Sequence, residues 1–546
     1  MFVKIKNKIK CRRESVKQTR THEKELALQR RKKFSADHKI SIAVPLYNTP
    51  LKLLEEMICS VLAQTYAGWE LCLADGSDAA HAYTREICVK YVQKDARIRY
   101  KKLEENTGIS GNTNEALRMA TGDYIALLDH DDRLHPSALF KVMEAICGQG
   151  ADLIYTDEKL FENIPEDGMS AHYKPDYSPD TLRGGNYICH FSVFSRKLME
   201  DAGGGFCSEF DGSQDFDMIL RLTEKAKKIV HIPEILYYWR ACSGSVAQDM
   251  TAKPYVFESA RRAIACHLER MGLKGKVTDS SELSSYRIRY ELEGSPLVSA
   301  IILCGKDADK VAECITALSR STYKNLEAVL VADEKVVEDA LSKIGSKVSF
   351  SVRVKKNTKS RAASFNSGAS EAKGAFYLFM DDTVRAITPA WIEEMLMFAQ
   401  RPDVGAVGAM LYYPDDTVRH AGIAFDRAFH PFRVYENIRR GSVGYMGRNT
   451  VVQNWSALSD ECFLISAGIF ADMGGFDEKF IKSTEDADLC LRLRGMNLLL
   501  VWTPYAELYQ NIKKEEEAED MDDMAYFDEK WKDEPHYDPY YNYHLL

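Results

Sequence analysis

The sequence predicts an α/β protein made of two similar domains, each built on a mostly parallel sheet. The chain has 546 residues, which is enough for two or three domains. Short apolar runs alternate with helical stretches along it, a pattern typical of parallel sheets covered by helices. Three landmarks of the first half recur in the second half in the same order. A repeat period this long indicates a duplicated domain rather than a solenoid.

The first half begins with a buried parallel strand over residues 40–45, which ends at Pro45. A helix is expected over 51–64 and a second strand over 69–74, followed by Asp75. This succession starts the predicted parallel sheet.

The same plan restarts with a strand over 296–303, a helix over 308–320 and a strand over 326–332 that ends at Asp333. Further on, 373–383 resembles 121–132, and 485–492 resembles 214–221. The three offsets between the copies are 258, 251 and 271 residues. We therefore place a basic arm at 1–39, a first domain at 40–280 and a second domain at 281–546, the last with an acidic C-terminal extension.

Composition excludes several classes. Apolar residues make up 45% of the chain, as in globular proteins, and no apolar run approaches the roughly 20 residues that span a membrane. No apolar stretch follows the basic N-terminus, so no secretory signal is expected. The 13 cysteines are scattered without a Cys-x-x-Cys pair, which argues against a disulfide framework or zinc cluster and favours the cytoplasm.

The net charge of −9 conceals an asymmetry. Residues 1–39 carry 14 Lys and Arg against 4 Asp and Glu, a net of +10, so the remainder carries −19. An acidic body argues against nucleic-acid binding. The basic arm could instead adsorb to an anionic membrane, fold back on the acidic stretch 515–534, or be a solvated tail that aids solubility.

An acidic cluster, Asp129-His-Asp-Asp132, follows the apolar run 124–128. Ligands bind at the carboxyl ends of strands in open α/β sheets, and Mg²⁺ or Mn²⁺ accepts one or two carboxylates plus phosphate oxygens. The cluster therefore predicts a divalent-metal and diphosphate site. The alternative is an acidic turn that caps the helix beginning near His135.

A second acidic pair, Asp215 and Asp217, opens an apolar-patterned helix. These residues could cap that helix, or one could act as a general base. The chain has no G-x-G-x-x-G after a first strand, no Walker motif and no His-Glu-x-x-His, which disfavours dinucleotide oxidoreductases, P-loop enzymes and zinc proteases.

Together these elements resemble the family 2 glycosyltransferases, which have the GT-A fold. In the first half the resemblance is carried by Pro45-Leu-Tyr-Asn48, Asp75-Gly-Ser77, Asn106-Thr-Gly-Ile-Ser110 with Asn114, Asp129-His-Asp131 as the DxD motif, Gly212-Ser-Gln-Asp215 and Leu236-Tyr-Tyr-Trp-Arg240. The last two motifs resemble a bacterial surface-polysaccharide subgroup. Tyr238 stands where many relatives have a possible metal ligand, His.

The second half resembles the family from Pro296 onward but departs from it. Leu303 replaces the proline, Met380 is taken to stand at the position of Asp129, Asp460 and Glu461 occupy a usually small position, and Gln510 replaces a metal-binding His. Asp382, Glu485 and Asp486 survive. Catalysis by the second domain is therefore left open.

The resemblance implies inverting transfer from a nucleotide-diphospho-sugar to a glycan or lipid-linked glycan, with Mg²⁺ or Mn²⁺ as cofactor, in cell-surface polysaccharide synthesis. Asp215 and Asp486 would be the bases, and Asp129, Asp131 and Asp382 the metal ligands. The expected donor-binding residues are Pro45, Tyr47, Asn48, Asp75, Gly108, Asn114, Asp129, Arg240, Asp333, Asn366 and Asp381. Trp239 and Arg240 would cover the donor, or would be a packed aromatic beside a surface arginine.

Three functional arrangements follow. Both domains could transfer sugars, the first alone could be catalytic with the second as scaffold or acceptor-binding module, or the chain could be a carbohydrate-binding pseudoenzyme. We expect a cytoplasmic enzyme with peripheral contact at the inner face of the plasma membrane. The sugar, nucleotide, acceptor and linkage do not follow from the sequence.

Overall fold

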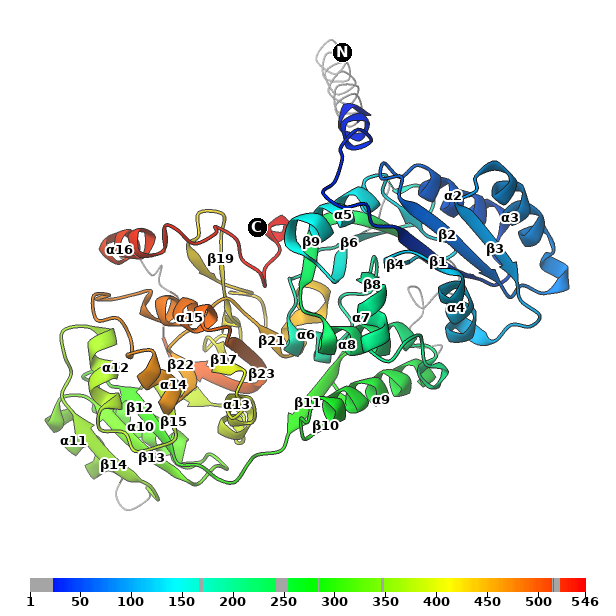
Figure 1. Cartoon of the computed structure of the whole chain (residues 1–546). Coiled ribbons are helices and arrows are strands. Elements are labelled where there is room, and N and C mark those ends of the chain that lie inside the picture. Colours follow the sequence, from blue (N-terminus) through cyan, green and yellow to red (C-terminus); the bar gives the residue numbers. More distant parts are fainter. Residues whose placement is uncertain are drawn as a thin grey trace, which may run out of the picture. The chain divides into compact units, whose positions relative to one another are not determined.

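The computed structural model describes residues 23–165, 170–241, 254–282, 284–344, 348–512, 514 and 521–546. The chain divides into two compact units (Figure 1). The first domain comprises residues up to Tyr177 together with Asn186–Met271, and the second comprises Ser178–Gly185 together with Gly272–Leu546.

The first domain is an α/β layer around one sheet. Its strands are β1 (Ile40–Leu46), β2 (Trp69–Asp75), β3 (Ile98–Lys102), β4 (Tyr124–Leu127), β5 (Arg133–Leu134), β6 (Leu153–Phe161), β7 (Ala171–His172), β8 (Val193–Ser195) and β9 (Ile229–Arg240). Its helices are α2 (Leu51–Leu62), α3 (Tyr83–Lys94), α4 (Gly108–Met119), α5 (Ala138–Gln149), α7 (Arg196–Asp201), α8 (Gln214–Lys225) and α9 (Pro254–Arg270). The predicted strands and helix at 40–74 are confirmed.

The strand order in this sheet is β3-β2-β1-β4-β8-β6-β9-β5, with β7 beside β6. The pairs β1–β2, β1–β4 and β2–β3 are parallel, and β8 runs antiparallel between β4 and β6. Nearly every residue of β1 and β2 is buried, as expected for strands covered on both faces. The carboxyl ends of β1, β2 and β4 therefore meet at one edge, where ligands bind in such sheets.

The second domain repeats this plan. Its strands are β10 (Gly275–Asp279), β11 (Tyr286–Tyr290), β12 (Val298–Leu303), β13 (Leu326–Val331), β14 (Ser351–Lys355), β15 (Phe376–Asp381), β16 (Val384–Ala386), β17 (Val404–Tyr412), β18 (Val418–His420), β19 (Ile423–Phe425), β20 (Pro431–Arg433), β21 (Gln453–Asn454), β22 (Cys462–Ser466) and β23 (Leu499–Gln510). Its helices are α6 (Pro179–Gly184), α10 (Ala308–Ser319), α11 (Glu334–Ile344), α12 (Arg361–Ala369), α13 (Trp391–Ala399), α14 (Ala467–Asp472), α15 (Glu485–Gly495) and α16 (Met521–Trp531).

The strand order β14-β13-β12-β15-β22-β17-β23-β16 follows the same path as the first sheet. The directions also match, since β12–β13 and β12–β15 are parallel and β22 is antiparallel to both β15 and β17. The duplication predicted from three landmarks therefore extends through the topology.

The boundary between the domains differs from the predicted one. The division lies at Met271, nine residues before position 280, because the hairpin β10–β11 belongs to the second domain. Helix α6 also belongs to the second domain, although the sequence before and after it belongs to the first.

Buried charge holds α6 in the second domain. Asp180 is 3% exposed, and its carboxylate accepts hydrogen bonds from Arg401 and from the Asn454 amide. The Asn454 side-chain oxygen in turn accepts from the backbone N–H of Asp180 at 3.0 Å. Sequence patterns did not reveal that α6 belongs to the second domain, because the contacts that hold it there join residues more than 200 positions apart.

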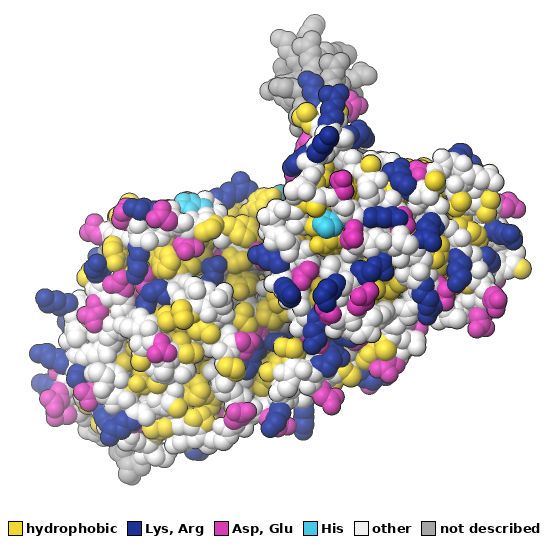
Figure 2. Space-filling view, viewed as in Figure 1, with side chains coloured by type: hydrophobic (Ala, Val, Ile, Leu, Met, Phe, Trp, Pro, Cys, Tyr) yellow, Lys and Arg dark blue, Asp and Glu magenta, His cyan; other side chains and the backbone are white. Residues whose placement is uncertain are grey.

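The described part of the basic arm is attached to the first domain. Gln29 is buried and accepts a hydrogen bond from Thr65, and Lys32 pairs with Glu144 at 2.6 Å. Figure 2 shows Lys and Arg side chains, with some Asp and Glu among them, on the narrow segment that enters this domain. The arm's first 22 residues, with its first basic cluster, lie outside the described residues.

Two further predictions concern disulfides and membrane-spanning helices. Every cysteine in the described ranges is a free thiol. Among the helices that the structure describes, none is long and apolar enough to cross a membrane.

Candidate active site

The predicted metal-binding acids follow β4 in the first domain. The side chains of Asp129 and Asp131 are 47% and 24% exposed, whereas Asp132 is 1% exposed. The next helix, α5, has Ser137 at its N-cap and no acid in its first turn, so the helix-cap interpretation is wrong. The cluster thus offers two carboxylates to a ligand and keeps a third inside.

Asp132 anchors this turn from below. Its carboxylate accepts hydrogen bonds from the Tyr237 hydroxyl at 2.5 Å and from the backbone N–H of Arg240 at 2.7 Å. Burial, together with the charges of Asp129 and Asp131, raises the pKa of Asp132 well above its usual range. The turn is therefore held by β9 while its outer carboxylates stay accessible.

Arg240 supports the same turn and is only 4% exposed, so the surface-arginine alternative is wrong. Its Nε donates to the carbonyl of Asp131 at 2.7 Å, and its Nη2 donates to Glu56 at 2.6 Å. The guanidinium also lies 4.4 Å from the ring centroid of Phe161. The structure gives Arg240 a positioning role, and direct contact with the donor stays a prediction.

His190 connects Asp129 to a buried ionic chain. Its Nε2 lies 3.6 Å from the Asp129 carboxylate, its Nδ1 lies 3.2 Å from Glu158, and its ring stacks on Tyr237 at 4.9 Å. Burial lowers the pKa of His190, but the contacts with Asp129 and Glu158 outweigh it and raise that pKa well above its usual range. Partial burial opposes ionisation of Asp129 as well, but the contact with His190 outweighs it and lowers the pKa of Asp129. An imidazolium therefore keeps Asp129 ionised.

Lys174 extends this chain inward. It is fully buried, its Nζ lies 3.3 Å from Glu158, and it donates to the carbonyls of Ile188 and His190. Positive and negative groups thus alternate from Lys174 through Glu158 and His190 to Asp129.

Asp215 lies in the first turn of α8, as predicted. Its Oδ2 accepts a hydrogen bond from the Asn186 amide at 3.1 Å. Burial raises its pKa, the charge of Asp129 raises it further, and the charge of His190 lowers it. The charges of His190 and Asp129 therefore act on Asp215 in opposite directions. Asp217 instead pairs with Arg221 at 2.9 Å and is structural.

The loops after β1 and β2 are joined to each other. The Asn48 amide donates to Asp78 at 3.0 Å, and the Asn48 backbone N–H donates to the Ser77 hydroxyl. Tyr47 is 47% exposed beside Pro45, which leaves its ring available to a ligand. The Asp75 carboxylate is 1% exposed and already accepts from Tyr100 and Ser77. In this structure Asp75 shapes the loop, and its role in reading the base stays a prediction.

Gly108 and Asn114 lie on α4. Gly108 begins the helix with a φ of +81°, which favours glycine. The Asn114 side chain exchanges hydrogen bonds with the backbone of Phe206 at 2.8 and 2.9 Å. Asn366 does the same with Phe476 in the second domain. Both asparagines clamp a loop, and their predicted contact with the donor stays untested.

Strand register corrects one predicted correspondence. Tyr124 of β4 pairs with Ile40, and Phe376 of β15 pairs with Val298, so the two strands align at an offset of 252 residues. Asp381, rather than Met380, therefore stands at the position of Asp129. The prediction that Met380 removes this carboxylate is wrong, and Thr383 replaces Asp131 instead.

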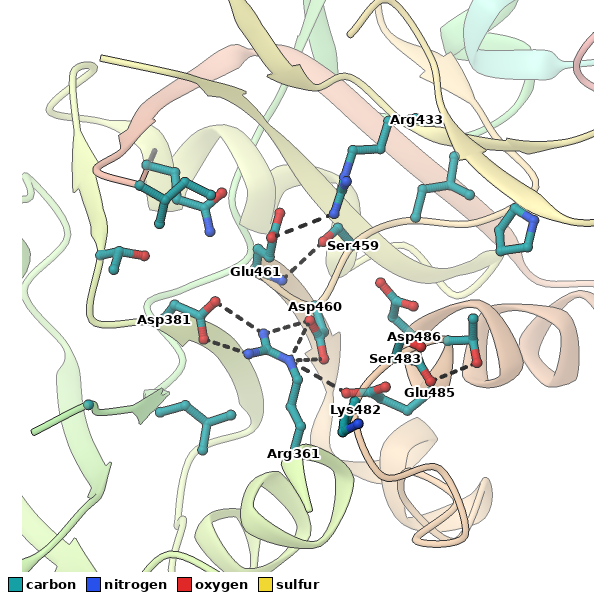
Figure 3. A pocket seen from close by; sticks show the side chains of 18 of the residues that line it. Arg361, Asp381, Arg433, Ser459, Asp460, Glu461, Lys482, Ser483, Glu485 and Asp486 are labelled. Atoms are coloured by element: carbon teal, nitrogen blue, oxygen red, sulfur yellow. Dashed lines mark hydrogen bonds and ion pairs between the residues drawn. The ribbon is translucent and has the colours of Figure 1, made fainter. Parts of the chain in front are cut away.

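In the second domain the strand-end aspartate, Asp381, is paired with an arginine of the same domain. Arg361, at the start of α12, donates to Asp381 through Nη1 at 2.8 Å and to Asp460 through Nη2 at 2.7 Å, and its Nε lies 3.5 Å from Glu485 (Figure 3). Asp382, predicted to bind a metal, accepts from the backbone N–H of Gly305 at 2.7 Å. Asn114 and Asn366 occupy corresponding places in the two domains. Arg361 lies five residues before Asn366, as Ile109 lies five residues before Asn114, so Arg361 takes the position of Ile109.

Ser195 pairs with Tyr124 and Ser466 pairs with Phe376, so the two serines correspond. His190 and Glu461 each lie five residues before these serines, and Glu461 therefore takes the position of His190. Glu461 pairs with the fully buried Arg419, which also donates to Gln510 at 2.9 Å. The charge at this position is thus reversed between the domains, and Asp381 has its positive partner, Arg361, on α12 instead.

Asp486 lies in the first turn of α15, in the place of Asp215. Burial and the charge of Asp460 raise its pKa to about 7. It lines a cavity of about 1180 Å³ with Glu485, Asp381 and Arg361. Asp333, predicted to bind the donor, accepts from the backbone N–H of Lys335 at the start of α11.

Several residues of these sites were missed by sequence reasoning. His190, Lys174 and Asn186 follow no short motif, and Arg361 lies outside the motifs that carry the family resemblance. Alignment of the two halves at the strand offsets could have revealed the exchange of His190 for Glu461 and of Ile109 for Arg361.

The two domains fit a divalent metal differently. Within the described ranges no group of three or more His, Cys, Asp or Glu side chains is arranged to hold a metal ion. Mg²⁺, however, is commonly held by one or two carboxylates with substrate phosphates completing its shell. The exposed Asp129 and Asp131 fit that mode. Asp381 does not, because both of its oxygens already accept from Arg361, and Asp382 has one oxygen engaged by the backbone N–H of Gly305.

Comparison with known proteins agrees with this fold. The model of the Glycosyl transferase family 2 matches residues 41–201 and 299–460. The chain therefore belongs to glycosyltransferase family 2, whose members transfer sugars, and both halves carry the family's domain.

The uncharacterized protein y4gI of Sinorhizobium fredii is 38% identical over 93% of this chain and 57% of its own length. The O-antigen biosynthesis protein RfbC of Myxococcus xanthus is 31% identical over 93% of this chain and 40% of its own length. The chain thus spans only about half the length of these relatives. Among solved structures, residues 1–349 of S. aureus TarS in complex with UDP-GlcNAc align with 42% of this chain and 66% of theirs, at 20% identity and a TM-score of 0.36.

Proposed function

We propose that the first domain transfers a sugar from a nucleotide-diphospho-sugar to a hydroxyl of a glycan or lipid-linked glycan, with inversion at the anomeric carbon. The proposal rests chiefly on one observation. Asp215 opens α8 with its carboxylate held by Asn186, and Asp129 and Asp131 present exposed carboxylates after β4 of the same domain. A base and a diphosphate-side anchor are the two elements that such a transfer needs.

In this mechanism the acceptor hydroxyl attacks the anomeric carbon from the side opposite the diphosphate. Asp215 takes the hydroxyl proton as the new C–O bond forms. The bond to the diphosphate breaks, and its electron pair leaves with the nucleoside diphosphate. Positioned proton transfer of this kind contributes about 10²–10⁴-fold to the rate. Asn186 holds the Asp215 carboxylate in place by donating to Oδ2.

Asp129 and Asp131 are the residues that would hold Mg²⁺ or Mn²⁺. A bound cation would neutralise charge on the departing diphosphate. His190 and Arg240 keep this turn in place from beneath, and the loop of Tyr47 and Asn48 lies at the same sheet edge for the nucleoside. RfbC, whose name refers to O-antigen biosynthesis, supports a surface polysaccharide as the product.

The test is a transfer assay on the full chain. The protein is incubated with a panel of nucleotide-diphospho-sugars, Mn²⁺ and surface-glycan fragments, and the product is analysed by NMR. We expect release of nucleoside diphosphate and an inverted anomeric configuration. A retained configuration would refute the mechanism, and no transfer from any donor would refute the function.

We also propose a cytoplasmic enzyme that touches the anionic inner face of the plasma membrane through its basic arm. Near such a surface each Lys or Arg can contribute about 1 kcal/mol. The deletion that tests this ends at residue 22, because Gln29 and Lys32 are bound to the first domain. Full-length protein should sediment with anionic but not neutral vesicles, and salt should release it. Unchanged sedimentation after the deletion would exclude the arm as anchor.

A further inference from the structure

We infer that the cavity of the second domain binds the uncharged hydroxyls of a glycan directly, without a metal ion or a nucleotide diphosphate, and that Arg361 occupies the place of the cation. The identity of this glycan as the acceptor rests on the proposed function of the first domain. Binding of sugar at the cavity itself does not.

Arg361 excludes the metal. It donates to both oxygens of Asp381, at 2.8 and 3.3 Å, and to both oxygens of Asp460, at 2.9 and 2.7 Å. A guanidinium cannot lose its charge in a protein, and its planar fork matches a carboxylate bidentately. A divalent cation would have to displace this fixed charge from two carboxylates at once.

The charge of the cavity also opposes a nucleotide diphosphate. Eight Asp or Glu residues line it against three Arg or Lys residues. Like charges repel strongly where water is partly excluded. A diphosphate without a metal would therefore meet net negative charge, whereas a neutral sugar would not.

Buried hydrogen-bond acceptors point to the ligand instead. Glu485 is 2% exposed and lines the cavity, and apart from the ion pair of Oε1 with Arg361 at 3.5 Å neither of its carboxylate oxygens accepts a hydrogen bond. One oxygen of Glu461, a residue that is 9% exposed, is in the same state. A buried acceptor left without a donor is destabilising, so these oxygens favour a ligand that supplies O–H groups.

The cavity also has the size and apolar face that a sugar needs. Its volume of about 1180 Å³ exceeds the usual 300–1,000 Å³ of a small-molecule pocket, which leaves room for more than one ring. Phe432 lines it and presents an aromatic surface for the C–H face of a pyranose. The geometry thus combines carboxylate acceptors with an apolar wall.

The first experiment tests exclusion of the metal. In the full chain the first-domain site is blocked by Asp129→Asn with Asp131→Asn, and Mn²⁺ binding is followed by EPR with UDP as probe. We expect no nucleotide-enhanced Mn²⁺ binding in this protein. Adding Arg361→Ala frees Asp381 and Asp460. The resulting protein should therefore bind Mn²⁺ at least about tenfold more tightly than the same protein with Arg361 intact. Mn²⁺–UDP binding with Arg361 intact would overturn the inference.

The second experiment tests sugar binding. Saturation-transfer NMR is recorded on the full chain in EDTA, with neutral di- to tetrasaccharides of glucose, galactose, N-acetylglucosamine and rhamnose. We expect transfer to at least one sugar, at least a fivefold loss in Glu485→Leu and in Phe432→Ala, and no change in the exposed control Glu338→Gln. Melting curves confirm that each variant is folded.

Absence of transfer to every sugar, or transfer unaffected in both cavity variants, would overturn the inference. The outcome is independent of catalysis, because Asp215→Asn should bind the same sugars. If sugar binding persists but no donor is ever consumed, the proposed function fails while this inference stands.

Discussion

The strand-end aspartates of the two domains occupy the same place in the same fold, but one is open to solvent and the other is not. Asp129 has an imidazolium beneath it and an open side toward solvent, whereas Asp381 is enclosed by the guanidinium of Arg361. Two exchanges account for this change: Glu461 for His190, and Arg361 for Ile109. A duplicated scaffold can therefore retain its acidic residues while its capacity to hold a metal is lost.

The largest expected effect separates the two candidate bases. Asp215→Asn should lower transfer by about 10²–10⁴-fold, because the amide keeps the shape of the side chain but cannot accept the proton. Asp486→Asn in the full chain should stay within about twofold of wild type. Steady-state transfer assays decide this. The reverse pattern would move catalysis to the second domain.

The next effect concerns stability. Arg401→Ala should destabilise the second domain by about 3–5 kcal/mol, because it leaves the buried carboxylate of Asp180 without its main partner. Arg401 and Arg183 outweigh burial and hold the pKa of Asp180 at about 2. Urea unfolding of the full chain measures the change.

Asp403→Ala is the matched control, because Asp403 also pairs with Arg401 but is 50% exposed. It should cost less than about 1 kcal/mol. Equal losses in the two variants would show that α6 is not held by the buried pair.

A smaller effect tests the metal in the first domain. Asp131→Ala should weaken Mn²⁺-dependent nucleotide binding by about 100-fold, or about 2.7 kcal/mol, through loss of one of two exposed carboxylates. Thr383→Ala, at the corresponding place in the second domain, should leave it unchanged. Calorimetry with UDP and Mn²⁺ measures both, and full binding in excess chelator would exclude the metal.

The smallest effect is a pH dependence that distinguishes two histidines. His420 is 1% exposed, and burial lowers its pKa to about 3, whereas His172, at the corresponding strand position, is hydrogen-bonded to Glu158. Because the unfolded pKa is about 6.5, the unfolded chain takes up the proton first. The stabilisation by neutral His420 is therefore complete above pH 6.5 and falls as the pH drops toward 3.

At pH 5 this loss amounts to about 2 kcal/mol for a buried imidazole. His420→Gln should flatten the acid side of the stability profile, as measured by urea midpoints between pH 4.5 and 7.5. His172→Gln serves as the comparison. An unchanged slope in His420→Gln would assign the acid sensitivity to other groups.

The sequence predicted the parts of this molecule that depend on local pattern. Alternating apolar runs and helices gave the two sheets, and short motifs located Asp129, Asp131 and Asp215. The correspondence of Met380 with Asp129 was wrong because matching motifs ignored the strand register, which Ile40 and Val298 define.

Contacts between distant segments could not be predicted in this way. His190 meets Asp129 only because β8 lies beside β4, and Arg361 meets Asp460 across 99 residues of sequence. The burial of Arg240 likewise depends on β9, and not on the residues beside it in the sequence. Side chains that position a site from beneath, such as His190, belong to no short sequence motif. Sequence patterns therefore identify the exposed carboxylates but not the residues of this kind that hold them in place.

The placement of α6 determines when this helix can dock during synthesis of the chain. Asp180 leaves the ribosome 274 residues before its partner Asn454, which at 5–20 residues per second is a delay of roughly 15–55 s. During that time the helix has no second-domain surface to join. If the gene were cut between the repeats, α6 could never dock, since neither fragment would contain both α6 and its binding site. Separate expression of the halves is thus a poor way to assign their activities, and point variants in the intact chain are the better means.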